Sequence, residues 1–355
     1  MTQSRAKRPS IDLVTDRLGQ TAFARAPMRI SFAGGGTDVA PYPEREGGAV
    51  LSAAIRRYAY ASARIREDDQ FVIHSLDLGL VAQGPIAELS ELDQQLHLLR
   101  GPISRLAGDD RGVELRVQSQ APPGSGLGAS STIVVAVVGA LLAAYGRSAG
   151  PHRVAEMAVS IEREDLGLTG GTQDHYAAVF GGFNFLEFND DEVTVNALRL
   201  PVSTVATLEH NLLLCDLGSS RESATIIDDQ RERFERDSES TVRALSRQKE
   251  LAVEMKQVLL SGDLDGFGGM LGESWAVKQE LSPLVATDAA VRAYDAAISA
   301  GALGGKITGA GGGGFMLFYA PFGKRFEVAQ ELRELGHEVL DIALDDDGLQ
   351  SWSHD

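Results

Sequence analysis

The pattern of apolar and polar positions predicts short strands in the first third of the chain. Apolar residues alternate with polar ones, or form brief runs between glycine, proline and charged residues, as is typical of β-strands. These runs are MRISFA (28–33), AYASARI (59–65), QFVIHS (70–75) and VELRVQS (113–119).

The periodicity then becomes helical. STIVVAVVGALLAAYG (131–146) is apolar on almost every side, which predicts a buried helix ending at Gly146. PHRVAEMAVSIEREDLG (151–167) places Pro151 at a helix start and apolar residues at helical spacing, so we expect a second helix that ends at Gly167.

Strands and helices are mixed in the rest of the chain. Helical periodicity covers 222–260 and 265–280, and a last helix precedes the final predicted strand. The further strands are GGFNFLEF (181–188), VTVNALRL (193–200), HNLLLCDLG (210–218), the two apolar runs in KITGAGGGGFMLFYAP (306–321), and HEVLDIAL (337–344). Because the two kinds of element do not alternate regularly, we predict an α+β fold rather than a doubly wound sheet.

A chain of 355 residues is long enough for two domains. We place the boundary at Pro201, after the strand pair 181–200. The expected organisation is a loose polar extension (1–20), an N-terminal domain (21–200) and a C-terminal domain (201–355).

The charge balance narrows the choice of partners. The formal net charge is −17, which argues against a nucleic-acid partner, because such a partner is bound largely through Lys and Arg. A phosphorylated small molecule is compatible with this charge, since a few local amides and a metal ion override the global field. We find no signal peptide and no stretch apolar enough to span a membrane, so we expect a cytoplasmic protein; a homodimer is left open.

The single cysteine, Cys215, excludes an intramolecular disulfide and a zinc site built from several cysteines. It lies within the apolar run NLLLCDLG, where a free cysteine is more often a small buried hydrophobic residue than a catalytic thiol.

Glycine, at 39 residues, is concentrated in a few loops, and PPGSGLGASST (122–132) is the most informative of them. Gly124, Gly126 and Gly128 allow the backbone to curl so that its amides face one point, at the start of the predicted helix 131–146. Backbone amides at a helix start, together with the helix dipole, bind anions such as phosphate. No lysine follows as in a Walker A motif. The alternative is a flexible turn followed by a capped helix.

Three other stretches contain residues suited to binding a ligand or a metal ion or to accepting a proton. RISFAGGGTD (29–38) combines three glycines with a hydroxyl and a carboxylate, which suits close approach to a polyol. IEREDLGLTGGTQD (161–174) separates Glu162 and Asp174, so one carboxylate is available for a metal ion and the other for a substrate proton. KITGAGGGGF (306–315) is a second glycine loop. Taken singly, these stretches are also explained as an ordinary turn, a solvated helix end and a glycine-rich hairpin.

Together, in this order, the four stretches resemble the GHMP kinases, the superfamily of galactokinase, homoserine kinase, mevalonate kinase and phosphomevalonate kinase. The resemblance extends from about Arg25 to the C-terminus. It implies an N-terminal domain like that of ribosomal protein S5, a ferredoxin-like C-terminal domain and an active site between them. APMRISFAGGGTDVAPY and GGTQDHYAAVFGGFNFLEF further resemble the D-glycero-D-manno-heptose 7-phosphate kinases, and sugar kinases related to L-fucokinase carry similar stretches.

The resemblance implies ATP and Mg²⁺ as cofactors and a sugar or sugar phosphate as the substrate. Ser130 and Glu162 would hold Mg²⁺, Ser131 would support the loop or cap the helix, and Asp174 would be the catalytic base. ATP would be bound by Pro123, Gly124, Ser125, Gly126, Leu127, Gly128, Ala129, Ser130 and Ser131. The substrate would be bound by Arg29, Gly35, Gly36, Thr37, Asp38, Thr308, Gly311, Gly312 and Gly313. Lys306 would either neutralise phosphate or face outward from its strand.

The narrower resemblance implies transfer of a phosphoryl group to the anomeric hydroxyl of a heptose 7-phosphate, giving a 1,7-bisphosphate for nucleotide-activated heptose synthesis. A second anion site is then required, and Arg221 in CDLGSSRESA is the candidate, with a surface arginine as the alternative. Thr172 and His175, beside Asp174, depart from the heptose kinase pattern. The competing functions are a kinase for a neutral sugar such as L-fucose and a non-catalytic sugar and ATP sensor.

Overall fold

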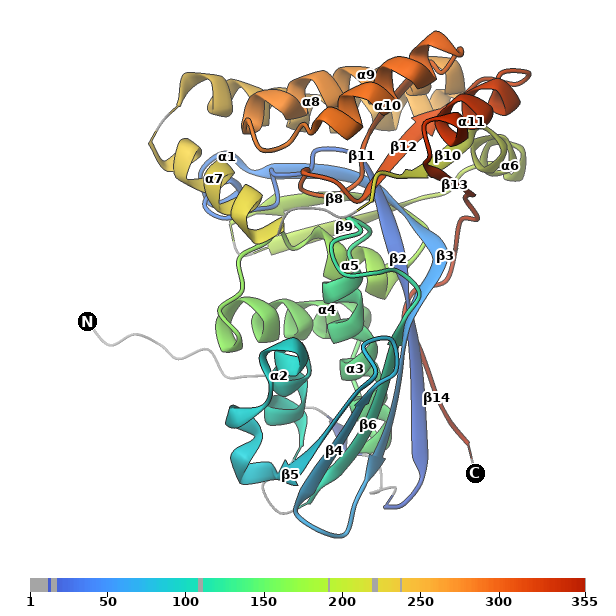
Figure 1. The fold of residues 1–355 in the computed structure, drawn as a ribbon. Helices are drawn as coiled ribbons and strands as arrows, with labels where there is room; N and C mark the ends of the chain where they lie inside the picture. Colours follow the sequence, from blue (N-terminus) through green and yellow to red (C-terminus); the bar gives the residue numbers. More distant parts are fainter. Residues whose placement is uncertain are drawn as a thin grey trace.

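The structure is a computed structural model that describes residues 12–13, 18–107, 111–190, 192–218, 223–236 and 238–354. Its N-terminal part is built on one long, bent sheet (Figure 1). The strand order is β14-β2-β3-β6-β4-β5, and β8 and β9 extend the sheet from β3. The bounds are β2 (Thr21–Ala33), β3 (Gly48–Ile65), β4 (Gln70–Ser75), β5 (Leu80–Pro85), β6 (Val113–Ser119), β8 (Phe183–Asn189), β9 (Glu192–Leu198) and β14 (Gln350–His354).

The two longest strands are β2 and β3, and β2 pairs along its whole length with residues 51–64 of β3. The other edge of β3 is shared, because its first residues pair with β8 and its last residues with β6. The β2–β3 register shifts between Pro27 and Met28 and again between Ser31 and Ala33. Such irregularities re-aim side chains next to functional sites. Arg29 lies between these two positions.

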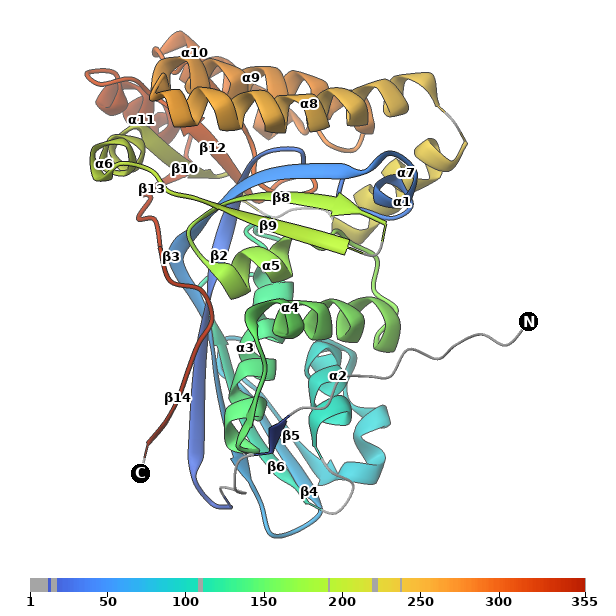
Figure 2. The ribbon, with the colours of Figure 1, turned by 180° about the vertical axis from the view of Figure 1, so that it is seen from behind.

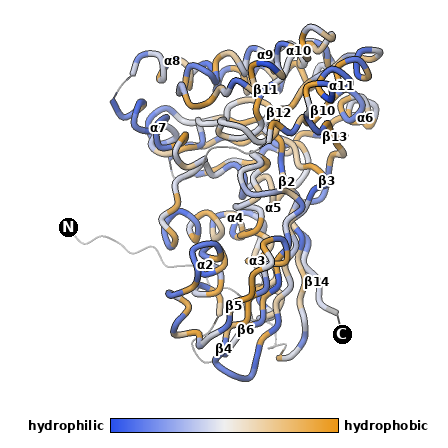
Figure 3. The backbone as a smooth tube through the Cα atoms, viewed as in Figure 1, coloured by the Kyte–Doolittle hydropathy of each residue, from blue (hydrophilic) through white to orange (hydrophobic). Residues whose placement is uncertain are grey.

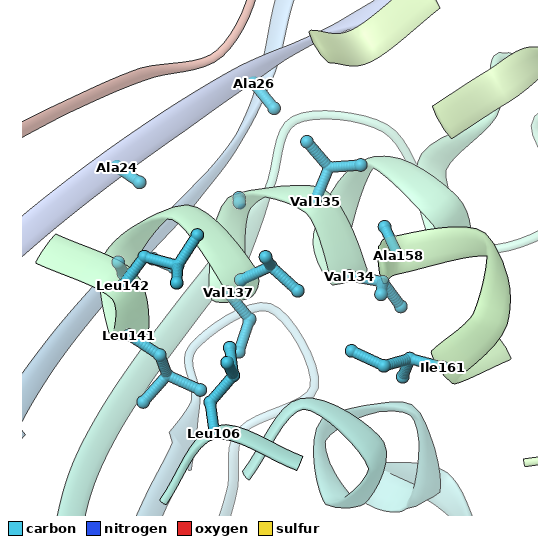
Figure 4. Packing of buried hydrophobic residues seen from close by; sticks show 14 of the residues in the cluster. Ala24, Ala26, Leu106, Val134, Val135, Val137, Leu141, Leu142, Ala158 and Ile161 are labelled. Atoms are coloured by element: carbon cyan, nitrogen blue, oxygen red, sulfur yellow. The ribbon is translucent and has the colours of Figure 1, made fainter. Parts of the chain in front are cut away.

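Helices cover one face of this sheet. They are α2 (His97–Leu106), α3 (Ala129–Ala144), α4 (Pro151–Ser160), a π-helical turn (Ile161–Asp165) that continues α4, and α5 (Gln173–Phe180). α3 lies in the middle, and Figure 4 shows its valines and leucines packed against β2, α2 and α4. Burial on all sides explains why its sequence is apolar throughout. The smaller elements are β1 (Asp12–Leu13), which pairs with β7 (Arg147–Ser148), α1 (Tyr42–Glu46), and 3₁₀ turns at Ile86–Glu91 and Gln94–Leu96.

The C-terminal part is an antiparallel sheet of order β11-β12-β10-β13 with helices packed around it. Its strands are β10 (Leu212–Asp216), β11 (Gly304–Ile307), β12 (Phe315–Tyr319) and β13 (Glu338–Asp341). Its helices are α6 (Val202–Asn211), α7 (Ser223–Glu235), α8 (Glu239–Ser261), α9 (Leu264–Leu281), α10 (Asp288–Ser299) and α11 (Arg325–Glu334). In Figure 3 the hydrophobic residues gather along α3 and the neighbouring strands, whereas α7 is mainly hydrophilic.

The two parts share one hydrophobic core rather than meeting at a polar interface. Met28, Ile30 and Phe32 of β2 pack with residues of α8, α9, β10 and β12. The Phe32 ring meets the Phe267 ring of α9 edge to face, with 5.1 Å between the centroids. A continuous core fixes the relative position of the two glycine loops that follow β6 and β11.

The structure confirms the predicted α+β class and the predicted strands and helices. It departs from the predicted division of the chain at one point, because residues after β13 return to the N-terminal sheet and β14 pairs with β2 (Figure 2). The expected extension (1–20) falls mostly outside the described residues.

Cys215 is a buried core residue of β10, where burial, followed by the charge of Asp216, raises its pKa to about 12. Within the described ranges, no helix combines the length and apolar character needed to cross a membrane.

Candidate active site

A cavity of about 630 Å³ is lined by residues of both sheets' loops and of α5, α7 and α9. It brings together most of the residues singled out in the sequence. Those that line it are Arg29, Gly35, Gly36, Asp38, Pro123, Gly124, Ser125, Gly126, Gly128, Ala129, Ser130, Ser131, Glu162, Asp174 and Thr308. Arg29 and Thr308 are 279 positions apart in the sequence, so the fold brings distant segments together in this site.

The loop 122–128 leads directly into α3. Gly128, with a φ of 78°, is the N-cap residue, and no side chain caps the helix. Ser130 and Ser131 lie inside the first turn of α3 and not at the N-cap position. The Ser130 side chain is exposed to the cavity, whereas Ser131 is buried and its hydroxyl hydrogen-bonds to Glu162. The first amides of a 16-residue helix therefore face the cavity beside a free hydroxyl, the arrangement that binds phosphate.

The second glycine loop lies directly behind the first. The Phe315 amide donates to the Ser125 carbonyl over 2.9 Å, and Gly309 lies so close to Gly126 that a Cβ on Gly309 would be 2.5 Å from the Gly126 Cα. Thr308 lines the cavity and donates its hydroxyl hydrogen to the Phe315 carbonyl. The C-terminal part thus supports the shape of the N-terminal loop by backbone contact.

Five residues that were expected to contact a ligand do not line the cavity. Gly311, Gly312 and Gly313 are buried outside the cavity lining, and the Gly312 amide donates to the Val285 carbonyl. Leu127 is fully buried in the shared core. Thr37 is also fully buried, and its hydroxyl contacts the Gly34 carbonyl and the Ala49 backbone. These residues shape the loops, and the cavity is lined by Gly309 and Ala310 where the sequence suggested 311–313.

Arg29 and Asp174 form an ion pair in the cavity wall. The Arg29 Nε lies 2.7 Å and its Nη2 2.6 Å from Asp174 Oδ1. The remaining Arg29 nitrogen, Nη1, donates to the Gly126 carbonyl over 2.6 Å. One guanidinium therefore connects the carboxylate on α5 to the glycine loop, and both charges are largely shielded from solvent, with side-chain exposures of 6% and 20%.

Asp38 fixes the start of α5, the helix that carries Asp174. Its carboxylate accepts from the Gln173 amide over 3.1 Å and from Gln173 Nε2 over 3.0 Å. It also accepts from the Gly36 amide over 3.1 Å. Asp38 thus has three donors within the chain, which indicates that it organises the cavity rather than only contacting a ligand.

Glu162 lies on the π-helical turn and is almost completely buried. Burial, the largest single influence, favours a raised pKa. The charge and hydrogen bond of His175, the charge of Arg163 and the Ser131 hydroxyl together outweigh it, and the pKa falls to about 2. His175 is fully buried, and its Nε2 hydrogen-bonds to Glu162 Oε2. Glu162 is therefore an ionised carboxylate at the cavity wall.

Arg163 holds the loop between Glu162 and Asp174. Its Nη1 donates to the Leu168 carbonyl over 3.0 Å and its Nη2 to the Gly171 carbonyl over 2.6 Å. This loop forms the cavity wall between the two carboxylates.

Sequence reasoning missed several polar residues of the cavity. Lys278 of α9 and Ser31 of β2 are buried and line it, as do Gln173 and Gln230. The sequence pattern could have identified Lys278, because this lysine occupies the same face of α9 as the buried residues Phe267, Leu271, Trp275 and Leu281. A lysine on an apolar helix face is unusual unless it is paired or functional.

Lys306 does not face outward, so that alternative is wrong. It is buried, and its ammonium donates to the carbonyls of Ser31 (2.6 Å) and Ile307 (3.0 Å). Burial, together with Lys278 and Arg29, holds its pKa well below the usual range. Arg221, the candidate for the second anion site, lies outside the described residues.

The geometry combines an anion-binding helix start, an ionised carboxylate beside a free hydroxyl, and a second carboxylate held by an arginine. These are the parts that phosphoryl transfer requires, since that reaction depends on positioning and charge neutralisation. The fold and site are those of a phosphotransferase.

Comparison with known proteins identifies the family. The model of the GHMP kinase N-terminal domain matches residues 96–182, and that of the C-terminal domain matches residues 255–338. The D-glycero-alpha-D-manno-heptose 7-phosphate kinase of Campylobacter jejuni is 35% identical over 94% of this chain and 99% of its own length. The chain therefore belongs to the GHMP kinase family. It is a kinase with an alcohol group as the acceptor, and it uses ATP.

Two further relatives bear on the substrate. The crystal structure of a D-glycero-D-manno-heptose 1-phosphate kinase from Bacteroides thetaiotaomicron has a TM-score of 0.78 and 31% identity, covering 93% of this chain and 98% of its own. A bifunctional fucokinase/GDP-fucose pyrophosphorylase of Arabidopsis thaliana is 26% identical over 92% of this chain but only 32% of its own length.

Proposed function

We propose that this kinase transfers the γ-phosphoryl group of ATP to the anomeric hydroxyl of D-glycero-D-manno-heptose 7-phosphate. The observation that carries the proposal is the Arg29–Asp174 pair in the same cavity as Ser130 and Glu162, in a chain 35% identical to a kinase of that heptose phosphate. The product would be a sugar 1,7-bisphosphate.

The donor set at Ser130 and Glu162 fits Mg²⁺. Both side chains line the cavity, and the Glu162 carboxylate is ionised, with a pKa of about 2. Mg²⁺ prefers hard oxygen ligands and is usually bound by one or two protein groups together with substrate phosphates. The described residues contain no cluster of three or more His, Cys, Asp or Glu that would suit another metal centre. Bound there, the ion would neutralise charge on the transferring phosphate.

Asp174 is proposed as the group that aligns the acceptor hydroxyl and accepts its proton. Arg29 holds this carboxylate through Oδ1, which leaves Oδ2 for the hydroxyl. The same arginine reaches the Gly126 carbonyl, so the base and the phosphate-binding loop keep a fixed separation. Fixing the two reacting groups in this way is a main source of rate acceleration.

The acceptor is proposed to lie beside Gly35 and Gly36, on the side of the cavity formed by Asp38 and Gln173. Asp174 follows Gln173 directly in α5, so a sugar in this position presents a hydroxyl to the proposed base. Mg²⁺, the anomeric position and the heptose itself are parts of this proposal, and the neutral-sugar kinase is the competing one.

The test is ATP consumption by the purified protein with Mg²⁺ and one acceptor at a time. The acceptors are D-glycero-D-manno-heptose 7-phosphate, the same heptose without phosphate, its 1-phosphate, L-fucose, mannose and galactose. Turnover confined to the 7-phosphate, with a product carrying a new anomeric phosphate by ³¹P NMR, supports the proposal. Efficient turnover of L-fucose or another neutral sugar, with none on the 7-phosphate, contradicts it.

A further inference from the structure

Three polar side chains from three elements converge on the space beside Gly35. A Cβ added to Gly35 would lie 3.8 Å from Ser31 Oγ, 3.8 Å from Gln173 Nε2 and 3.9 Å from Lys278 Nζ. All three side chains are at least nine-tenths buried, and all three residues line the cavity. The missing side chain of Gly35 leaves this space open.

Several polar atoms at this point lack partners, although Gln173 Nε2 donates to Asp38. Ser31 Oγ and Gln173 Oε1 are buried without a hydrogen bond. Among the described residues, the Lys278 ammonium has neither a hydrogen bond nor an ion pair, although its side chain is only 4% exposed. Buried polar groups in native proteins are almost always paired, and an unpaired one indicates a ligand or ordered water.

Lys306 offers an internal comparison. It is equally buried, but two backbone carbonyls accept from its ammonium, which makes it a structural lysine. Lys278 has no such acceptors. A buried ammonium without an acceptor is unfavourable, so its retention on an apolar helix face points to an external partner.

The local charges indicate that this partner is an anion. Arg29 is already paired with Asp174, and Asp38 is the carboxylate whose charge acts on Lys278. Asp38 already accepts from three N–H groups. An ammonium can only donate hydrogen bonds, so an anion beside Gly35 would supply the acceptor that Lys278 lacks among the described residues.

We infer that Lys278 and Ser31, beside Gly35, form a phosphate-binding subsite that takes the phosphate ester of the acceptor sugar. The ammonium and the hydroxyl both donate to phosphate oxygens, and the glycine admits the bulky group. This inference rests on the proposed function, since it assigns the group that recognises a sugar phosphate. The γ-phosphate of ATP is the other source of the same chemistry. The acceptor is favoured because Gly35, Asp38 and Gln173 surround the ammonium, whereas the proposed nucleotide site is the loop 123–131.

Lys278→Met is the decisive variant, because it removes the charge and keeps an unbranched side chain only one atom shorter than that of lysine. Lys324→Met is the matched control, since Lys324 is exposed and outside the cavity lining. With the heptose 7-phosphate, we expect Lys278→Met to raise KM about 10- to 100-fold, as for loss of a charged hydrogen bond. KM for ATP should stay within about twofold of wild type, as should all constants of the control.

Ser31→Ala is the second variant, with an expected rise of several-fold in KM for the sugar phosphate alone. Lys278→Arg keeps the charge and should recover part of the affinity lost in Lys278→Met. If Lys278→Met instead raises KM for ATP, or lowers kcat without raising KM for the heptose 7-phosphate, the subsite belongs to the γ-phosphate and the assignment to the acceptor is wrong. Unchanged constants with every substrate would overturn the subsite itself.

Inhibition by inorganic phosphate tests the subsite independently of which sugar the enzyme phosphorylates. Inorganic phosphate should inhibit the wild-type enzyme competitively with the acceptor, whichever sugar is turned over, and this inhibition should weaken at least tenfold in Lys278→Met. If the heptose 7-phosphate is not a substrate but this inhibition is present, the proposed function fails and the subsite stands. If phosphate competes with ATP alone, or does not inhibit, the acceptor subsite is refuted.

Discussion

The buried imidazole of His175 is hydrogen-bonded to the carboxylate of Glu162, the residue proposed to bind Mg²⁺. The other ring nitrogen, Nδ1, faces the Thr172 carbonyl at 3.4 Å. A histidine between a backbone carbonyl and a carboxylate fixes the orientation of that carboxylate. Partners of this kind tune metal binding without touching the metal.

Replacement of His175 should therefore change the requirement for Mg²⁺. We expect His175→Leu to raise the Mg²⁺ concentration for half-maximal activity about 10- to 100-fold, as is typical when the partner of a metal ligand is removed. His175→Gln retains a donor and should have a smaller effect. The measurement is a Mg²⁺ titration of initial rates at saturating sugar, together with Mg²⁺-dependent binding of a non-hydrolysable ATP analogue. An unchanged Mg²⁺ requirement in His175→Leu would show that His175 only packs.

Asp174→Asn should lower kcat by about 10²- to 10⁴-fold, the usual contribution of a positioned acid–base group. Binding of the ATP analogue should persist, because Asp174 lies on α5 and not in the glycine loop. Near-normal turnover would remove Asp174 from the role of base.

Arg29 and Asp174 act as one unit in this geometry, so their substitutions should not be additive. Arg29→Met alone leaves a largely buried carboxylate unpaired, which costs about 3–5 kcal/mol in comparable cases. Arg29→Met combined with Asp174→Asn should be more stable than Arg29→Met alone. Urea unfolding of the two single variants and the double variant gives the coupling energy. Additive effects on the free energy of unfolding would contradict a stabilising pair.

The sequence predicted the elements and motifs whose signals are local. The strands from 28–33 to 113–119, the buried helix 131–146 and both glycine loops each carry their own pattern of apolar, glycine or capping residues. Most of the predicted site residues line one cavity, because they lie in these loops.

What the sequence did not predict depends on contacts between distant segments. β14 is a short, polar strand, QSWSH, whose pairing with β2 joins residues more than 300 positions apart. Thr37 and Gly311 have the residue types of ligand contacts, yet packing turns them away from the cavity. Lys278 was missed because a single lysine in an amphipathic helix does not show which partner the fold places beside it.

The contact between the two glycine loops should be sensitive to one added methyl group. In Gly309→Ala the new Cβ would lie 2.5 Å from the Gly126 Cα, a backbone atom that cannot move aside without reshaping the phosphate loop. We expect a loss of stability of about 1–3 kcal/mol, as for overpacking, and an increase in KM for ATP.

Gly269→Ala is the matched control, because Gly269 lies in the exposed part of α9 with nothing within 4 Å of an added Cβ. It should raise stability by about 0.5–1 kcal/mol through helix propensity and leave KM for ATP unchanged. Equal effects of the two substitutions on KM for ATP would show that loop contact does not set the nucleotide site.

Lys278 should give the stability of the protein a specific dependence on pH. Burial lowers its pKa from 10.5 to about 8, with Asp38 opposing this shift and Arg29 adding to it. Between these two values the unfolded chain binds a proton that the folded chain has released. The free energy of unfolding therefore rises as the pH increases from about 8 toward 10.5, by an amount on the order of 3 kcal/mol.

Lys278→Met removes this titration. Below pH 8 the wild type carries the full cost of a buried charge. The free energy of unfolding of the variant should therefore exceed that of the wild type by most in this range, and this difference should shrink as the pH rises. Urea unfolding of both proteins at several pH values between 7 and 9.5 measures this difference. The comparison cancels the titration of groups that do not interact with Lys278, with Lys306, whose pKa Lys278 helps to lower, as the exception. A difference that is constant with pH would mean that the Lys278 amine has the same proton affinity in the folded and unfolded chains, and hence that the pocket beside Gly35 is open to water.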